Sequence, residues 1–216
     1  MQGDSIVIEE HHRKSAQGVC ELTLSEIKSI NSRFTLSIAG ESGSGKSEIA
    51  MALAEELEKH KFSTVILQQD DYFVYPPKTN DRSRRQDISW VGPQEVHLNL
   101  LDEHLRAFID GEQYVNKPLV SYADDAIRKE QLEFNAAQVA IAEGTYTSLL
   151  ENINRRVFID RNYMDTKKHR ERRMRDSSEL DEFINSVLTI EHGIISTHKE
   201  KADIIIYKDY SVKLNS

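Results

Sequence analysis

The chain has a single cysteine, Cys20, among 216 residues. One cysteine excludes an intramolecular disulfide and a zinc site built from cysteines, and it fits a reducing compartment. No apolar run approaches the roughly 18 residues that a membrane-spanning helix needs. The first four residues lack the basic and apolar regions of a secretion signal. These absences predict a cytoplasmic protein with no membrane partner.

A net positive charge is also lacking, because 36 Asp and Glu outnumber 28 Lys and Arg and the formal net charge is −8. Phosphate backbones need a basic surface, so no nucleic-acid partner is expected. The length and an apolar content of 38% fit one domain with a lid or a small insertion. Basic residues are concentrated locally in 165–176, which contains six Lys and Arg and three Asp and Glu. A basic patch in an acidic protein predicts that an anion binds there.

A phosphate-binding motif, G-x-x-x-x-G-K-[ST], occupies positions 40–47. An apolar strand is predicted before it at 34–39, and helix-forming residues follow at 45–60. In this arrangement the backbone N–H groups of the loop and of the first turn of the helix point at one place. There Lys46 would reach the β- and γ-phosphates and Ser47 would bind Mg²⁺. The loop is therefore predicted to bind a nucleoside triphosphate through Gly40, Glu41, Ser42, Gly43, Ser44, Gly45, Lys46 and Ser47.

Short apolar strands alternate with helices along the rest of the chain. Further strands are predicted at 63–68, 137–142, 155–159 and 203–207, and helices at 93–110, 165–176 and 179–199. This order predicts an α/β protein, a three-layer α/β/α P-loop NTPase fold with a parallel sheet and a basic helical lid. Ligands in such sheets bind beyond the carboxyl ends of the strands.

The main domain is expected to cover residues 34–216, with the lid at about 163–178. Residues 1–33 would form an N-terminal extension packed on the edge of that domain, with a short strand at 5–8 and a helix around 24–31. Two polar stretches, 71–92 and 111–136, are interpreted as long connections that act as lids or substrate loops.

Acidic residues follow two of the predicted strands. Strand 63–68 runs into Asp70 and Asp71, and a carboxylate there would orient an acceptor hydroxyl, take its proton and help to hold the metal. Asp70 is the first candidate and Asp71 the second, because a one-residue shift at a strand end exchanges the inward side chain. Glu143 ends strand 137–142 and would hold Mg²⁺ beside Ser47. A solvated turn is the alternative interpretation of each acidic position.

Two arginines in the basic segment share one face of a predicted helix. Arg172 and Arg175 are three residues apart, so both guanidinium groups could close over the γ-phosphate and neutralise its developing charge. The alternative is a solvated helix in which Glu171 and Asp176 pair with the arginines.

These features, in this order, resemble the uridine kinase/phosphoribulokinase family of P-loop kinases. The matching pieces are Gly40–Ser47, Leu67–Phe73, Ala142–Gly144, Asp165–Asp176 and Lys201–Ile206, which together span most of residues 34–207. The resemblance implies that Asp70 acts on the acceptor hydroxyl, that Glu143 helps to hold Mg²⁺, and that lid arginines contact phosphates.

The acceptor side of the family pattern matches less well. Uridine kinases carry Asp-His-Pro where this chain has Val91-Gly92-Pro93, so the Asp that holds the ribose hydroxyls is missing. The resemblance then implies an acceptor site that uses Asp70, Tyr72, Asp87 in place of the missing Asp, Tyr122 and Arg128.

The function predicted is ATP- and Mg²⁺-dependent transfer of the γ-phosphate to an alcohol of a small molecule. A nucleoside is the leading acceptor, followed by sugar phosphates and by pantothenate- or glycerate-like molecules. A GTPase-type switch is disfavoured because no D-x-x-G occurs and Asn116-Lys117-Pro118-Leu119 lacks the Asp of the guanine-reading motif. A non-catalytic ATP-binding module is the remaining alternative, and homo-oligomerisation is left open.

Overall fold

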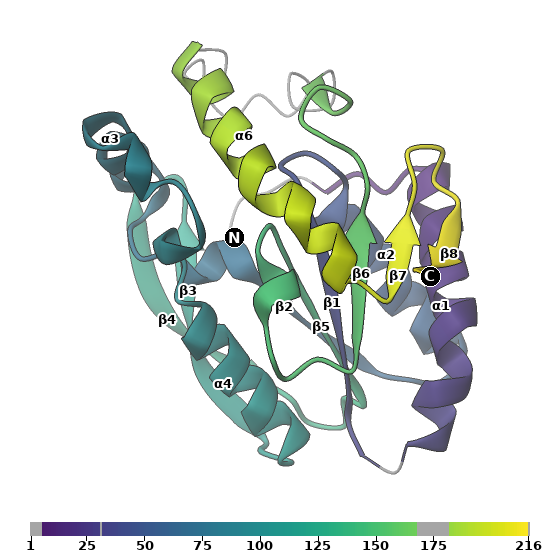
Figure 1. Ribbon diagram of the computed structural model, residues 1–216. Helices are drawn as coiled ribbons and strands as arrows, with labels where there is room; N and C mark the ends of the chain where they lie inside the picture. Colours follow the sequence, from purple (N-terminus) through teal and green to yellow (C-terminus); the bar gives the residue numbers. More distant parts are fainter. Residues whose placement is uncertain (1–5, 31, 168–181, 216) are drawn as a thin grey trace.

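The computed structural model describes residues 6–30, 32–167 and 182–215. Within this part of the chain, six strands form the main sheet in the order β2-β5-β1-β6-β7-β8 (Figure 1). Neighbouring strands are parallel except for β7 and β8. The strands are β1 (Phe34–Gly40), β2 (Thr64–Gln68), β5 (Val139–Gly144), β6 (Arg155–Ile159), β7 (Ile204–Ile206) and β8 (Val212–Leu214). The α/β prediction is confirmed, and each of the five predicted strands starts and ends within two residues of its expected position.

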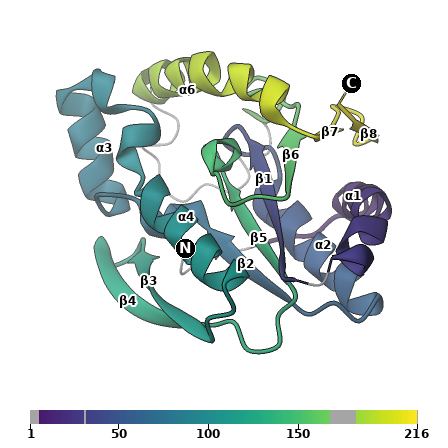
Figure 2. The ribbon, with the colours of Figure 1, turned by 60° about the horizontal axis from the view of Figure 1, so that its bottom comes forward.

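Helices cover both faces of the sheet (Figure 2). Side chains alternate along each strand, so Val139 and Ile141 join the core cluster beneath α1 (Glu10–Ser29) and α2 (Lys46–Lys59). Their neighbours Ala140 and Ala142 face the cluster beneath α4 (Leu98–Ile109) and α6 (Glu182–Ile195). The predicted three layers are therefore present.

The register of the central strands brings three strand ends to one level. Glu143 lies opposite Ile38 of β1 on one side and opposite Gln68 of β2 on the other. The loop after β1 and the turn after β2 consequently begin at the same edge of the sheet. This edge is where the sequence predicted the phosphate, metal and acceptor groups.

The N-terminal part of the chain differs from its prediction. Residues 6–8 are not in a strand, and the helix expected around 24–31 instead begins at Glu10 and runs for 20 residues. Its buried positions follow helical spacing, but polar residues share them with apolar ones: His12, Ser15, Ala16, Val19, Cys20, Thr23 and Ile27. This mixture hides the apolar stripe in the sequence. Helix α1 packs on α2 and on the β7–β8 edge of the domain.

A β-hairpin replaces the connection expected at 111–136. Strands β3 (Tyr114–Ser121) and β4 (Ala126–Glu133) pair antiparallel in a separate two-stranded sheet. Most of β4 is exposed and charged, and for this reason its sequence does not look like a strand.

The stretch expected as a loop at 71–92 contains helix α3 (Pro77–Gln86), and the predicted helix at 93–110 begins as a 3₁₀ turn before α4. Short 3₁₀ turns occur at η1 (Gln69–Tyr72), η2 (Ile88–Trp90), η3 (Pro93–Glu95), η4 (Thr147–Leu149) and η6 (Ser196–Lys201). The basic segment from residue 168 onward, with Arg172 and Arg175, lies outside the described residues, so the predicted lid stays a prediction. Among the residues described, no helix is long and apolar enough to cross a membrane.

Candidate active site

A hydroxyl and a carboxylate meet where the phosphate loop enters α2. Ser47 Oγ donates to Glu143 Oε1 at 2.9 Å, and Gln68 Nε2 donates to the same oxygen at 3.3 Å. Burial raises the pKa of Glu143 to about 7, and the charge of Asp70 contributes to the rise, against the opposing effects of Lys46 and Ser47. Two oxygen ligands of this kind suit Mg²⁺.

Phosphate oxygens and water can complete the coordination of such an ion. Among the described residues, no group of three or more His, Cys, Asp or Glu side chains could hold a metal ion. Mg²⁺ in phosphate-transfer sites is commonly bound by one or two protein ligands together with phosphate oxygens and water. The Ser47–Glu143 pair therefore fits an ion that arrives with a nucleotide.

The phosphate loop is held by segments far away in the sequence. Lys46 Nζ donates to the carbonyl oxygen of Glu41 at 3.0 Å. The buried Glu41 carboxylate accepts from the Tyr163 N–H at 2.6 Å and contacts His192 Nδ1 of α6 at 2.6 Å. Thr166 Oγ1 donates to the carbonyl oxygen of another loop residue, Ser42, at 3.1 Å. The segment after β6 and helix α6 thus brace the loop, a role that no local sequence signal indicates.

The two neighbouring aspartates after β2 have different surroundings. Asp71 is buried, and it accepts from Lys117 Nζ at 2.7 Å and from the Val120 N–H at 3.1 Å. This pair anchors the β3–β4 hairpin to the end of β2. Asp70 is half-buried and lies close enough to Glu143 for its charge to raise the pKa of that carboxyl. Asp71 is thus held in a structural ion pair, and Asp70 stays the predicted carboxylate for an acceptor.

One of the predicted acceptor contacts is wrong. Tyr72 is 0% exposed within the core, and its hydroxyl lies 2.8 Å from His104 Nδ1. Because the side chain is packed and its hydroxyl is paired internally, Tyr72 cannot touch a substrate in this structure. The sequence does not show this direction, because Tyr72 lies at the end of a short 3₁₀ turn whose residues project in different directions.

The other predicted acceptor residues stay predictions. Asp87 is exposed and accepts from the Ser89 N–H at 2.9 Å, so its carboxylate caps the η2 turn. The Tyr122 ring has Lys78 Nζ at 5.9 Å from its centre. Arg128 forms an exposed ion pair with Asp124 at 2.7 Å.

A buried ionic cluster ties α3 to α6 near this site. Glu95 is fully buried and accepts from Asn80 Nδ2 at 2.8 Å, from the Gly92 N–H at 2.9 Å and from Arg84 Nη2 at 2.9 Å. Arg84 Nη2 also reaches Glu191 Oε1 of α6 at 3.4 Å. Burial raises the pKa of Glu191, and the nearby charge of Arg84 counteracts this effect.

Two pockets lie at different ends of the sheet. One of about 420 Å³ reaches Ser47 and Glu143 from the side of the hairpin. Its lining residues are Ser47, Met51, Ile66, Gln68, Asp71, Lys117, Leu119, Glu130, Leu132 and Glu143.

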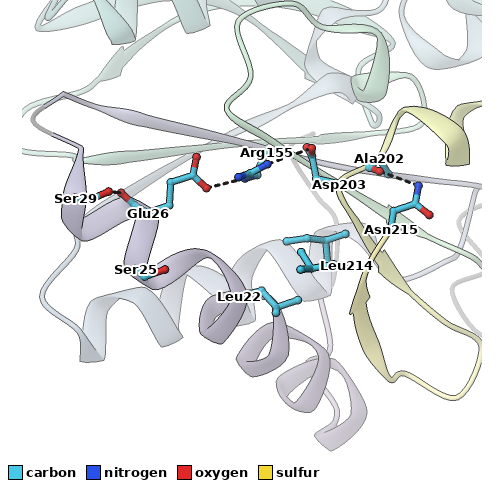
Figure 3. A pocket seen from close by; sticks show the side chains of 10 residues that line it. Leu22, Ser25, Glu26, Ser29, Arg155, Ala202, Asp203, Leu214 and Asn215 are labelled. Atoms are coloured by element: carbon cyan, nitrogen blue, oxygen red, sulfur yellow. Dashed lines mark hydrogen bonds and ion pairs between the residues drawn. The ribbon is translucent and has the colours of Figure 1, made fainter.

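The other pocket, of about 680 Å³, is shown in Figure 3. There Arg155 bridges Glu26 at 2.6 Å and Asp203 at 3.3 Å. Because Arg155 begins β6 and Asp203 precedes β7, this second pocket lies at the amino edge of the sheet, away from the phosphate loop.

The fold and the loop define a P-loop nucleotide-binding protein. Residues 35–208 match the model of the Phosphoribulokinase / Uridine kinase family. The chain therefore belongs to this family, whose members are kinases.

Its relatives include proteins with different substrates. The bifunctional alpha-galactosidase/sucrose kinase AgaSK of Mediterraneibacter gnavus is 28% identical over 192 residues, which are 83% of this chain and 20% of that protein. The chain thus spans about a fifth of the length of AgaSK. The uridine kinase of Staphylococcus epidermidis is 28% identical over 197 residues, which are 86% of this chain and 92% of that protein. A solved structure of a possible uridine kinase from Bacillus stearothermophilus has the same fold, with a TM-score of 0.56 and 18% identity over 78% of this chain and 94% of that one.

Proposed function

We propose that the protein transfers the γ-phosphate of ATP to a hydroxyl group of a small molecule, with Mg²⁺ as cofactor. The observation that carries this proposal is the contact between Ser47 and Glu143, made beside Asp70 at one edge of the sheet. A phosphate loop alone indicates nucleotide binding. The two acidic residues add a place for the metal and a group that can take a proton from an acceptor.

Each residue of the site has a defined part in the transfer. Lys46 and the backbone N–H groups of the loop hold the β- and γ-phosphates. Ser47 and Glu143, with Asp70 beside them, would hold the metal, which when bound neutralises charge on the phosphate oxygens. Asp70 orients the acceptor hydroxyl and accepts its proton. Arg172 and Arg175, which lie outside the described residues, are proposed to neutralise the transferred phosphate.

A nucleoside is the first candidate acceptor, supported by the similarity to uridine kinases. A neutral sugar is the second candidate, and the charges around the site favour it. Asp70 and Glu143 lie beside the place proposed for the acceptor hydroxyl, so a neutral acceptor would meet less repulsion there than one that already carries a phosphate or a carboxylate. Position 91, where uridine kinases have Asp, is a buried valine. AgaSK, a relative whose name includes sucrose kinase, is consistent with such an acceptor.

The acceptor can be identified by ADP release from Mg·ATP across a panel of nucleosides, neutral sugars, sugar phosphates, glycerate and pantothenate. We expect one neutral class, nucleosides or sugars, to raise ADP release well above the rate with water. Stimulation by anionic acceptors alone would contradict the inferred repulsion. ATP binding without stimulation by any acceptor would contradict the kinase proposal and favour the non-catalytic ATP-binding module.

A further inference from the structure

The position of the acidic residues fixes the direction in which ATP would lie. Glu143 is the last residue but one of β5 and Asp70 follows β2, and both strands lie on the same side of β1 in the sheet. If the transferred phosphate lies toward these two residues, as the proposed function requires, the nucleoside end of ATP extends to the other side of β1. That side holds the carboxyl ends of β6 and β7 and the start of α1 (Figure 1).

Two rings and one guanidinium group lie in contact at this place. The rings of His11 and Tyr210 lie 4.0 Å apart between centroids, and the Arg161 guanidinium carbon lies 4.7 Å from the centre of the Tyr210 ring. Arg161 Nη1 also donates to the Tyr210 hydroxyl. All three side chains are half-buried, so each keeps some exposed surface. Aromatic and guanidinium faces are the groups on which nucleic-acid bases stack.

The cluster is joined directly to the phosphate loop. His12 Nε2 lies 3.1 Å from His11 Nε2, and a Cβ atom placed on Gly45 would lie only 3.2 Å from His12 Nε2. Gly45 is in the left-handed region with φ of 99°. The first turn of α1 therefore packs against the last glycine of the loop, which places the three side chains of the cluster within reach of a nucleotide that the loop holds.

The backbone of Tyr210 supports a functional role. Its φ of 63° is in the left-handed region, which Gly, Asn and Asp adopt far more readily than an aromatic residue. The strained turn is held by the bond from Ser15 Oγ to the Tyr210 carbonyl oxygen at 3.1 Å and by the Tyr210 N–H, which donates to the Tyr207 carbonyl oxygen at 2.8 Å. Strain that is maintained by the surrounding structure often marks a ligand contact.

We infer that His11, Tyr210 and Arg161 form the contact surface for the base and ribose of the donor nucleotide, an inference that rests on the proposed function. His11 and Tyr210 fall outside residues 35–208, the part of the chain that matches the family. Helix α1 and the β7–β8 turn are then parts of the nucleotide site in this chain.

Equilibrium binding of two probes tests this inference. ATP carries base, ribose and phosphates, whereas inorganic tripolyphosphate carries the phosphates alone. The main variant is Tyr210→Asn, because asparagine tolerates the left-handed backbone while it removes the ring. A second variant, His11→Ala, changes a partly exposed position in the first turn of α1. Tyr114→Ala, an exposed tyrosine at the start of the β3–β4 hairpin, is the matched control.

We expect Tyr210→Asn to weaken ATP binding by about tenfold, the size of one stacking contact, while tripolyphosphate binding stays within about twofold. His11→Ala should act in the same direction and Tyr114→Ala should change neither affinity. Equal losses for both probes, or no loss for either, would overturn the inference while leaving the phosphate loop in place. A wild-type protein that binds neither probe would contradict the proposed function as well.

Discussion

Ser47 Oγ and Glu143 Oε1 are 2.9 Å apart, although the two residues are separated by 96 positions in the sequence. The contact joins the first turn of α2 to the end of β5. It depends on the register of β5 with β1 and β2, which places the carboxyl ends of the three strands side by side. A hydroxyl and a buried carboxylate held in this way are the protein's side of the proposed Mg²⁺ site.

Replacing Ser47 with Ala removes one of the oxygen atoms proposed to bind Mg²⁺. We expect acceptor-dependent ADP release to fall on the order of 100-fold, because the metal contributes several kcal/mol of charge stabilisation in phosphate transfer. A higher Mg²⁺ concentration should restore part of the rate. The measurement is ADP release in a Mg²⁺ titration. Ser25→Ala, an exposed serine in the pocket at the opposite edge of the sheet, should behave as wild type. An unchanged Mg²⁺ dependence in Ser47→Ala would contradict the assignment.

The raised pKa of Glu143 predicts a pH-dependent stability. Its pKa is 4.5 in the unfolded chain and about 7 in the fold without bound ligands, so the folded state holds one extra proton between these values. The contribution of Glu143 to the free energy of unfolding is therefore greatest below about pH 4.5. It falls by up to about 3 kcal/mol as the pH rises to 7. Urea unfolding at pH 5 and pH 7.5 measures the change.

Glu143→Gln isolates this contribution, because other buried groups titrate in the same range. The histidines His104 and His198 have lowered pKa values through burial and act in the opposite direction, losing stability as the pH falls. Relative to wild type, Glu143→Gln should become more stable as the pH rises from 5 to 7.5. Parallel pH curves for the two proteins would show that the carboxylate is already charged at pH 5.

Lys117 and Asp71 form a buried ion pair with side chains 5% and 3% exposed. Lys117→Met takes the cation away from a buried carboxylate, so we expect a loss of about 3–5 kcal/mol in the free energy of unfolding. Adding Asp71→Asn should recover part of that loss. Chemical denaturation of the single and double variants measures both. A cost below about 1 kcal/mol for Lys117→Met would mean that Asp71 is accessible, and it would become a candidate base again.

The buried contact between Tyr72 and His104 can be tested apart from the acceptor site. Tyr72→Phe removes the hydroxyl that pairs with His104 and keeps the ring in the core, so we expect a loss of about 1 kcal/mol in stability. The KM for the acceptor should not change. A raised acceptor KM with unaltered stability would show that the hydroxyl faces the substrate after all.

The sequence allowed a good prediction of the central part of the fold. The strands predicted at 34–39, 137–142 and 155–159 are buried along most of their length, and short apolar strands that alternate with helices are typical of a parallel sheet. Glu143 was found because an acid at the end of such a strand must lie at the ligand-binding edge.

The periphery was harder to predict for physical reasons. Strand β4 is exposed and charged, and α1 buries His12, Ser15 and Thr23 in place of apolar residues, so neither shows its pattern in the sequence. The direction in which the Tyr72 side chain points depends on its position in the four-residue η1 turn, and sequence patterns do not fix that position. The partners of Glu41 and Asp71 come from segments 46 to 151 positions away, and only the tertiary fold reveals them.

The proposed transfer depends most on the role of Asp70, which Asp70→Asn tests with almost no change in size. ATP affinity and acceptor-dependent turnover should be measured on the same preparation. We predict that ATP affinity stays within a few-fold of wild type while turnover falls by about 100-fold or more, the usual range for the loss of a general base. Full turnover in Asp70→Asn, with normal ATP binding, would contradict the proposed transfer site.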